Sequence, residues 1–319
     1  MPSNYDVNPL SLEGVKTYPL ASRRSKVTVA DFSQPCGEQS DLREFLARLP
    51  NILAVQSLRD LAAQMRNARK RKKPIIWGIG GHVIKTGLAP IIIDLMKRGF
   101  VTAIAANGSV LVHDAEIALI GSTSEDVDAT LPEGIFGGAE ETGQLLNNAA
   151  RQGFADGIGL GEALGRALTA MNPPHSEVSL LCTAYRAMVP FTAHLTIGGD
   201  ITHFHQTVDG ASLGATSHTD FRLLGELVRR MDDGGVYLNV GSAVVLPEVF
   251  LKCVTLVRNL GHSLTNITTA NLDFIQSYRP LTNVVRRPTE QNGHGYSITG
   301  HHELTIPLLA AELICGGSS

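Results

Sequence analysis

Two short apolar segments joined by a glycine-rich turn and one predicted helix constrain the fold of this chain more than any other feature. Residues 75–79 (IIWGI) are apolar throughout and residues 101–106 (VTAIAA) are apolar except for Thr102, which is typical of parallel strands covered on both faces. A turn at residues 80–82 (GGH) leads into a helix that we predict over residues 86–98. Such a strand–helix–strand unit predicts two neighbouring parallel strands with a right-handed crossover.

The rest of the chain continues this alternation of strands and helices. The pattern predicts an α/β protein with a doubly wound, mostly parallel sheet. We assign residues 56–319 to one α/β domain, and residues 1–55 to an N-terminal arm and helix that packs on the main body or on a neighbouring subunit. We predict helices over residues 40–49, 57–69, 138–151, 159–171, 175–186, 219–231, 247–260 and 301–313, and strands at 190–197, 235–240 and 263–269.

Charge and composition exclude several classes of partner. The formal net charge of −3 predicts no general attraction to nucleic acid or to anionic membranes. The basic run at residues 69–73 has no interleaved aromatic side chains, so we interpret it as cations that favour a helix C-terminus. No apolar run approaches the roughly 20 residues needed to cross a bilayer. With no signal-like segment and four widely spaced cysteines, we expect a cytoplasmic protein.

Polar side chains gather after the predicted strands, where ligands of open parallel sheets bind. Glycines there let backbone N–H groups approach a phosphate, while imidazoles and carboxylates can carry protons. These positions are Gly80, Gly81 and His82 after the first strand; Asn107, Gly108, Ser109, His113 and Asp114 after the second; Gly198, Gly199, Asp200, His203 and His205 after the third; and Thr268, Thr269, Ala270, Asn271 and Asp273 around the end of the strand at 263–269.

Each local motif leaves an alternative open. Residues 78–81 only loosely resemble the dinucleotide fingerprint, because no acidic residue ends the second strand. His203 and His205 could be a pair of metal ligands, but we favour a polar pocket lining and assign no metal. His301 and His302 begin the last helix, where they either cap it or take part in a site. We find no nucleophile elbow and no P-loop.

Several of these motifs resemble deoxyhypusine synthase, and the likeness extends over about residues 75–313. Residues 112–116 (VHDAE), after 106–108, are closer still to the ornithine cyclodeaminase domain found in some arginine-degrading proteins. The matching segments are 79–88 (IGGHVIKTGL), 95–101 (LMKRGFV), 105–108 (AANG), 189–191 (VPF), 209–214 (DGASLG), 267–270 (ITTA) and 304–312 (LTIPLLAAE).

The resemblance implies a Rossmann-like domain that binds NAD in a homotetramer with its sites at dimer interfaces, so we expect a dimer or tetramer. It also implies the contacts. Gly80, Gly81 and Thr86 would lie at the first NAD loop; Asn107 and Gly108, with Asp114, at the second; Thr269, Ala270 and Asp273 near the nicotinamide half or a ribose; and His301 and His302 near the adenine or ribose end.

One departure from that family changes the expected reaction. Deoxyhypusine synthase uses a lysine between its I-N-T-A strand and last helix, whereas this chain has no lysine after Lys252. The corresponding loop offers Arg279, Arg286 and Arg287, and an arginine stays protonated and cannot act as an amine nucleophile. The sequence therefore predicts that this protein is not a deoxyhypusine synthase.

We expect an enzyme that uses NAD to act on a small amine or amino acid, by transient hydride transfer and deamination or cyclodeamination, in the transferase or lyase class. Asp200 or Asp209 would hold the cationic amine, and His113, His203 or His205 would act as general acid and base. One alternative is a metal-dependent hydrolase that uses His113, Asp114, His203 and His205. The other is a regulator that binds NAD without turnover.

Overall fold

The computed structural model describes residues 4–316, and its centre is one six-stranded parallel sheet. The strand order β3-β2-β1-β4-β5-β6 reverses between β1 and β4, as in a Rossmann-like fold. The predicted doubly wound α/β fold is therefore confirmed. The strands are β1 (Ile75–Ile79), β2 (Ala103–Asn107), β3 (Phe191–His194), β4 (Val236–Val240), β5 (Thr268–Asp273) and β6 (His294–Thr299).

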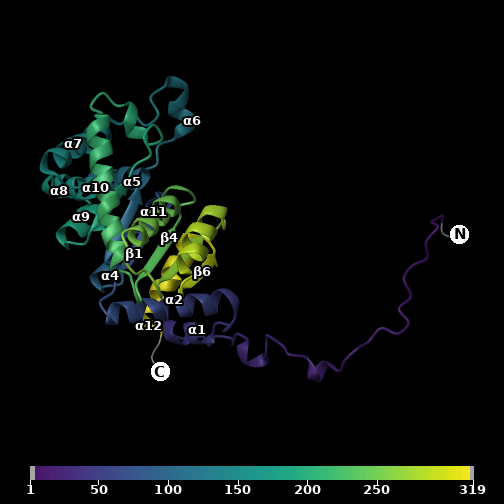
Figure 1. Ribbon diagram of the computed structural model, residues 1–319. Helices are drawn as coiled ribbons and strands as arrows, with labels where there is room; N and C mark the ends of the chain where they lie inside the picture. The colour runs from purple at the N-terminus through teal and green to yellow at the C-terminus, as the bar shows by residue number, and fades with distance from the viewer. Residues whose placement is uncertain (1–3, 317–319) are drawn as a thin grey trace.

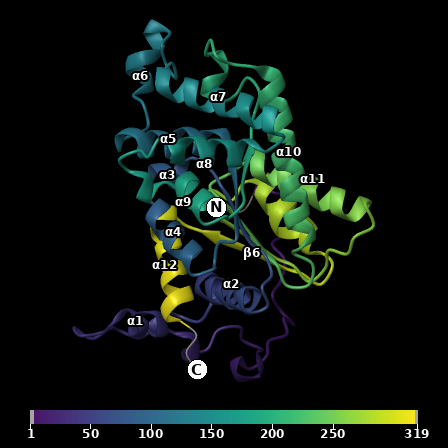
Figure 2. The same ribbon diagram turned by 90° about the vertical axis from the view of Figure 1, so that its left-hand side faces the viewer.

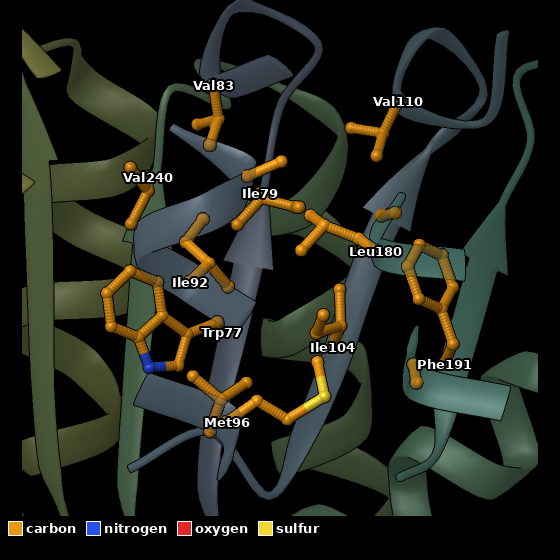
Figure 3. Close-up of a cluster of buried hydrophobic side chains, with 14 of the residues drawn as sticks. Trp77, Ile79, Val83, Ile92, Met96, Ile104, Val110, Leu180, Phe191 and Val240 are labelled. Atoms are coloured by element: carbon orange, nitrogen blue, oxygen red, sulfur yellow. The ribbon is translucent and has the colours of Figure 1, made fainter. Parts of the chain in front are cut away.

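The middle strand β1 is buried along its whole length, because side chains pack on both of its faces. Trp77 and Ile79 point into one core together with Val240 of β4 (Figure 3), and Ile76 points into the core on the opposite face. The Trp77 Nε1–H donates to the Phe100 carbonyl at 3.1 Å, so its one polar group is satisfied. Each such large apolar side chain contributes about 1.5–3 kcal/mol by leaving water.

Helices cover the two faces of the sheet unequally (Figures 1 and 2). The Trp77 face carries α2 (Leu53–Lys70), α3 (His82–Lys85), α4 (Ala89–Lys97), α5 (Gly108–Ile120), α9 (Leu180–Arg186) and α12 (His302–Cys315). The opposite face carries α10 (Gly210–Arg229), α11 (Val245–Asn259) and the π-helical segment η6 (Pro280–Arg286). Helices α7 (Glu140–Asp156) and α8 (Leu160–Ala170) pack beside α10 and β3.

Shorter elements lie between these helices and strands, and Figure 1 shows α6 at one extremity of the molecule. The segment that contains α6 joins α5 to α7, beyond the carboxyl ends of the strands. The shorter elements are α1 (Leu42–Arg48), α6 (Val127–Thr130), η1 (Leu20–Ser22), η2 (Val29–Asp31), η3 (Leu131–Glu133), η4 (Ser176–Val178), η5 (Ile201–Phe204) and η7 (Arg287–Thr289).

The helix predicted at 86–98 corresponds to α4, and a separate short helix, α3, precedes it over the predicted turn. Gly87 between them has a left-handed φ of +74°, and Pro90 in the first turn of α4 favours a fresh helix start. No helix was predicted directly after the second strand, yet α5 begins at Gly108, immediately after β2. Asn107 caps α5, with its side-chain oxygen 3.4 Å from the Val110 amide.

The strand predicted at 263–269 corresponds to β5, which begins five residues later, at Thr268, and ends at Asp273. Its sequence TTANLD looks too polar for a buried strand, yet all six residues are buried. Internal hydrogen bonds satisfy these side chains: Thr269 donates to the Val284 carbonyl at 2.7 Å, and Asn271 donates to Gln276 at 2.8 Å. The same reading missed the edge strand β6, whose side chains are mostly exposed. Helix α10 begins nine residues earlier than predicted, after Asp209.

The first part of the N-terminal arm does not pack on the main body, whereas its helix α1 packs against α12. Residues 4–30 are exposed throughout, and Figure 1 shows the arm running away from the domain beyond α1. Within the described residues, no helix is both long enough and apolar enough to span a bilayer. The arm's exposed apolar side chains include Leu10, Leu12, Val15, Tyr18, Leu20, Val27, Val29 and Phe32.

Candidate functional site

The reversal of strand order places a crevice position between the ends of β1 and β4. The loops that follow these strands touch through their backbones. The Gly80 amide donates to the Val240 carbonyl at 2.9 Å, and a Cβ on Gly80 would lie 2.0 Å from the Gly241 carbonyl oxygen. Only glycine fits there. Gly78 lies two residues earlier, inside β1, and makes room for a different neighbour: a Cβ there would lie 2.2 Å from the Tyr237 hydroxyl.

The first glycine loop also rests against the start of α5. A Cβ on Gly81 would lie 2.5 Å from the Ser109 hydroxyl and 3.1 Å from Cδ2 of His113. Ser109 donates to the Asn107 side chain at 2.8 Å, which ties the end of β2 to the same corner. The structure therefore brings together the loop after β1 and the start of α5, which directly follows β2.

A histidine, a threonine and a glutamate form a hydrogen-bonded chain beside this loop. Nδ1 of His113 lies 2.8 Å from the Thr123 hydroxyl, which in turn donates to Glu116. Thr142 of α7 donates to the other Glu116 oxygen at 3.2 Å. Burial raises the pKa of Glu116, but the neighbouring His113 imidazole and the hydrogen bonds from Thr123 and Thr142 outweigh it and hold that pKa below its ordinary value.

Asp200 reaches the same corner from the loop after β3. A Cβ on Gly108 would lie 2.3 Å from the Asp200 carboxyl group, so α5 must begin with glycine for the aspartate to fit. One carboxyl oxygen accepts from the Thr196 amide at 2.9 Å. Burial raises the pKa of Asp200, against the opposing effects of that amide and of His203.

These groups line one cavity of about 200 Å³ at the carboxyl ends of β1, β2 and β3. The volume suits a molecule of amino-acid size. Phe136 and Gly137, from the segment that contains α6, close one side. Sequence reasoning missed Glu116 and Glu125; the only signal was a carboxylate three residues after His113 on the α5 helix. The polar lining consists of Lys85, Ser109, His113, Glu116, Ser124, Glu125 and Asp200.

A second cluster, made of rings, lies at the carboxyl ends of β1, β5 and β6. Phe274 stacks on His301 with ring centroids 5.6 Å apart and planes 10° apart. His82 lies edge-on to His302 at 5.5 Å. His302 is buried: its Nε2 is 3.1 Å from the Leu272 carbonyl oxygen, its Nδ1 has no partner, and burial lowers its pKa. Phe274 and His301 remain exposed.

Three of the expected cofactor contacts lie inside the protein instead. Asp114 is fully buried, where it accepts hydrogen bonds from Ser179, Leu180 and Leu181 and so caps α9. Thr269 and Ala270 are buried inside β5, because that strand ends at Asp273 rather than at residue 269. None of these three can touch a ligand at the strand ends.

The other expected site residues are dispersed. Asp209 caps α10 by accepting from the Ala211 and Ser212 amides, and Thr86 bonds to the His82 carbonyl at 2.9 Å. Asp273 accepts from the Phe274 amide at 2.8 Å. His203 remains close to Asp200, in a separate hollow.

The four residues of the metal-hydrolase alternative do not converge. His205 bonds to Thr207 at 2.8 Å and packs against Gly143 of α7. Asp114 caps α9, and His113 bonds to Thr123. Across residues 4–316, the His, Cys, Asp and Glu side chains form no group of three or more that could hold a metal ion.

Comparisons with known proteins point to the same fold. Residues 59–157 match the family of arginine dihydrolase ArgZ-like C-terminal Rossmann-fold domains. An ornithine cyclodeaminase of Methanothermobacter thermautotrophicus is 27% identical over 148 residues, which are 46% of this chain and 33% of that protein. This chain therefore spans only about a third of the length of that curated relative.

Two solved structures share the architecture. AgrE in its complex with ornithine and NAD⁺ has a TM-score of 0.53 at 16% identity, over 81% of this chain and 32% of AgrE. A conserved LOR/SDH protein of Methanococcus maripaludis has a TM-score of 0.52 at 16% identity, over 82% of this chain and 70% of that protein. At these identities the likeness shows the Rossmann-like fold alone.

Proposed function

We propose that this protein is an NAD-dependent enzyme that deaminates or cyclodeaminates a small amino acid. One observation carries the proposal. The cavity that holds His113, Glu116 and Asp200 abuts the Gly81 loop at the point where the strand order reverses. A proton-transferring group thus lies beside the position where α/β sheets of this kind bind dinucleotides.

The residues at the strand ends fit a dinucleotide. Glycine at positions 80, 81 and 108 lets the segments at these strand ends pack closely, because a Cβ at any of the three would collide with a neighbouring protein atom. We propose that backbone N–H groups at these strand ends bind the pyrophosphate. Asn107 stands where many such sites have an acidic residue, so its amide would contact a ribose. Phe274 and His301 offer a flat surface for a planar ring. When bound, NAD would supply an acceptor for the two electrons removed from the carbon that bears the amine.

The protein's own groups account for binding and proton transfer. Glu116, ionised near neutral pH, and Asp200 present carboxyl groups to the cavity, where they would attract an ammonium group. His113 would move a proton at its Nε2 atom. Of the two expected amine-binding aspartates we propose Asp200, because it lines the cavity, whereas Asp209 caps α10.

Two relatives support ornithine as the first substrate to test, namely the ornithine cyclodeaminase and AgrE in its complex with ornithine and NAD⁺. Lys85, the only lysine in the cavity lining, is exposed, whereas a lysine nucleophile needs a desolvated site, so we propose that the reaction proceeds without a lysine imine. We expect ammonia release from ornithine that requires NAD. Tight NAD binding without turnover of ornithine or any other small amine would instead favour the non-catalytic regulator.

We further propose that residues 56–319 act as one domain and that the molecule assembles into a dimer or tetramer. The exposed apolar side chains of the arm support assembly, because a monomer rarely leaves so many of them in water. Light scattering at micromolar concentration tests this: deletion of residues 1–40 should lower the mass to that of a monomer. A monomeric full-length chain would contradict the proposal.

A further inference from the structure

We propose that Thr123 is a positioning residue that fixes the tautomer of His113, so that Nε2 is the unprotonated nitrogen facing the cavity. Thr123 lies in the turn after α5, two residues beyond Gly121, whose left-handed φ of +73° ends the helix. Its hydroxyl stands between the imidazole and the carboxylate: it is 2.8 Å from His113 Nδ1 and bonds to Glu116. Without it, Nδ1 would face a carboxylate oxygen 3.9 Å away, beyond hydrogen-bond distance.

The directions of these hydrogen bonds follow from the chemistry of the three groups. An ionised carboxylate can only accept, and a threonine hydroxyl has one hydrogen to donate. Hydrogen bonds to Glu116 hold its pKa below the ordinary value despite its burial, so it is ionised near neutral pH. The Thr123 hydrogen therefore goes to Glu116, and toward His113 the same oxygen acts as an acceptor. Nδ1 of the neutral imidazole must then carry the hydrogen.

The consequence falls on the other ring nitrogen. When Nδ1 carries the hydrogen, Nε2 of the neutral ring has a free lone pair and can take a proton. His113 lines the cavity, and within residues 4–316 no side chain or backbone group bonds to its Nε2. The opposite tautomer would present an N–H to the cavity and could not act as a base. The catalytic use of Nε2 rests on the proposed function, whereas the tautomer itself does not.

The chain offers a matched control in Thr142. Both threonines donate to Glu116, but only Thr123 contacts His113. Thr123→Val and Thr142→Val each keep the size of the side chain and remove one hydroxyl that donates to the Glu116 carboxylate. Thr123→Ser keeps a hydroxyl at the first position and should restore the original state. Comparison of the three variants separates control of the tautomer from a general loss of hydrogen bonding around Glu116.

Long-range ¹H–¹⁵N correlation spectra of ¹⁵N-histidine-labelled full-length protein test this inference without any substrate, at a pH where His113 is neutral. The His113 signals are assigned by their loss in His113→Asn. We expect Nδ1–H in the wild type, in Thr142→Val and in Thr123→Ser, and a shift toward Nε2–H in Thr123→Val. Nε2–H in the wild type would overturn the proposal, and so would an unchanged tautomer in Thr123→Val or the same shift in Thr142→Val. If the spectra agree but NAD-dependent turnover is never found, only the proposed function fails.

Discussion

The two halves of the sheet's carboxyl edge differ in the kind of group they present. The half after β2 and β3 has charged, partly enclosed side chains: His113, Glu116 and Asp200 face a cavity of about 200 Å³. The half after β5 and β6 presents rings, with Phe274 and His301 stacked and exposed. We therefore propose that proton transfer belongs to the first half and recognition of a planar ring to the second. The glycine loop after β1 joins them.

The largest expected effect comes from removal of the imidazole in the first half. His113→Asn should lower turnover about 10²- to 10⁴-fold, the usual contribution of a general acid or base. NAD affinity should stay within about twofold. His205→Asn is the control, because His205 packs against α7 outside the cavity. Steady-state rates of ammonia release check the prediction; equal losses in the two variants would show that the cavity is not the reaction site.

Asp200→Asn should act on substrate binding more than on the chemical step. Loss of one carboxylate facing an ammonium group should raise KM about tenfold, which corresponds to about 1.4 kcal/mol. The side chain can still accept from the Thr196 amide, so the loop should keep its shape. Kinetics over a range of substrate concentrations check this. A tenfold fall in kcat at unchanged KM would assign Asp200 to proton transfer instead.

Phe274→Ala tests the second half. Loss of a stacking surface worth about 0.5–1.5 kcal/mol should weaken NAD binding about two- to tenfold. The same change should leave the substrate KM, measured at saturating NAD, within about twofold. Calorimetric titration with NAD and steady-state kinetics provide the two numbers. A larger effect on the amino acid than on NAD would reverse the assignment of the two halves.

A last prediction concerns stability rather than the site, and it rests on a buried carboxyl outside both halves. Burial raises the pKa of Asp220 from 3.8 to about 7 in the folded protein, although the Gly161 and Ala193 amides oppose the shift. The folded state therefore binds an extra proton between these two values, and this contribution to the free energy of unfolding falls as pH rises through them.

Asp220→Asn keeps an acceptor for both amides and removes the titration. We compare the free energy of unfolding of the wild type with that of the variant. The wild-type value minus the variant value should fall by a few kcal/mol between about pH 4 and about pH 7, because a pKa difference of one unit corresponds to about 1.4 kcal/mol. Urea titrations at several pH values measure it. A difference that stays constant with pH would contradict the raised pKa.

The fold was predictable where burial and local pattern agree. The apolar run at 75–79 is β1 at the predicted boundaries, and the alternation of elements predicted the parallel sheet. Prediction failed where polar side chains satisfy one another inside the protein, as along β5. It also failed at the edge strand β6, because exposed edge strands lack an apolar signature.

The candidate site was predictable only in part, because its groups meet through tertiary contacts. Gly80, Gly81, Gly108 and His113 follow strands, and that position alone pointed to them. Asp114 has the same local signature, yet its partners on α9 lie 65 or more residues away and bury it. No feature of the sequence pointed to Thr123, because its contact with His113 depends on the turn after α5 that brings the two side chains together.

Calorimetric titration of NAD into the wild type, Gly81→Ala and Gly214→Ala tests the central claim most directly, namely that the glycine loop joins the two halves into one cofactor site. A Cβ on Gly81 would displace Ser109 and His113, whereas Gly214 lies on an exposed turn of α10 with open space around it. We predict that Gly81→Ala weakens NAD binding at least tenfold, about 1.4 kcal/mol, and that Gly214→Ala binds like the wild type. Equal NAD affinity in all three proteins would contradict the claim.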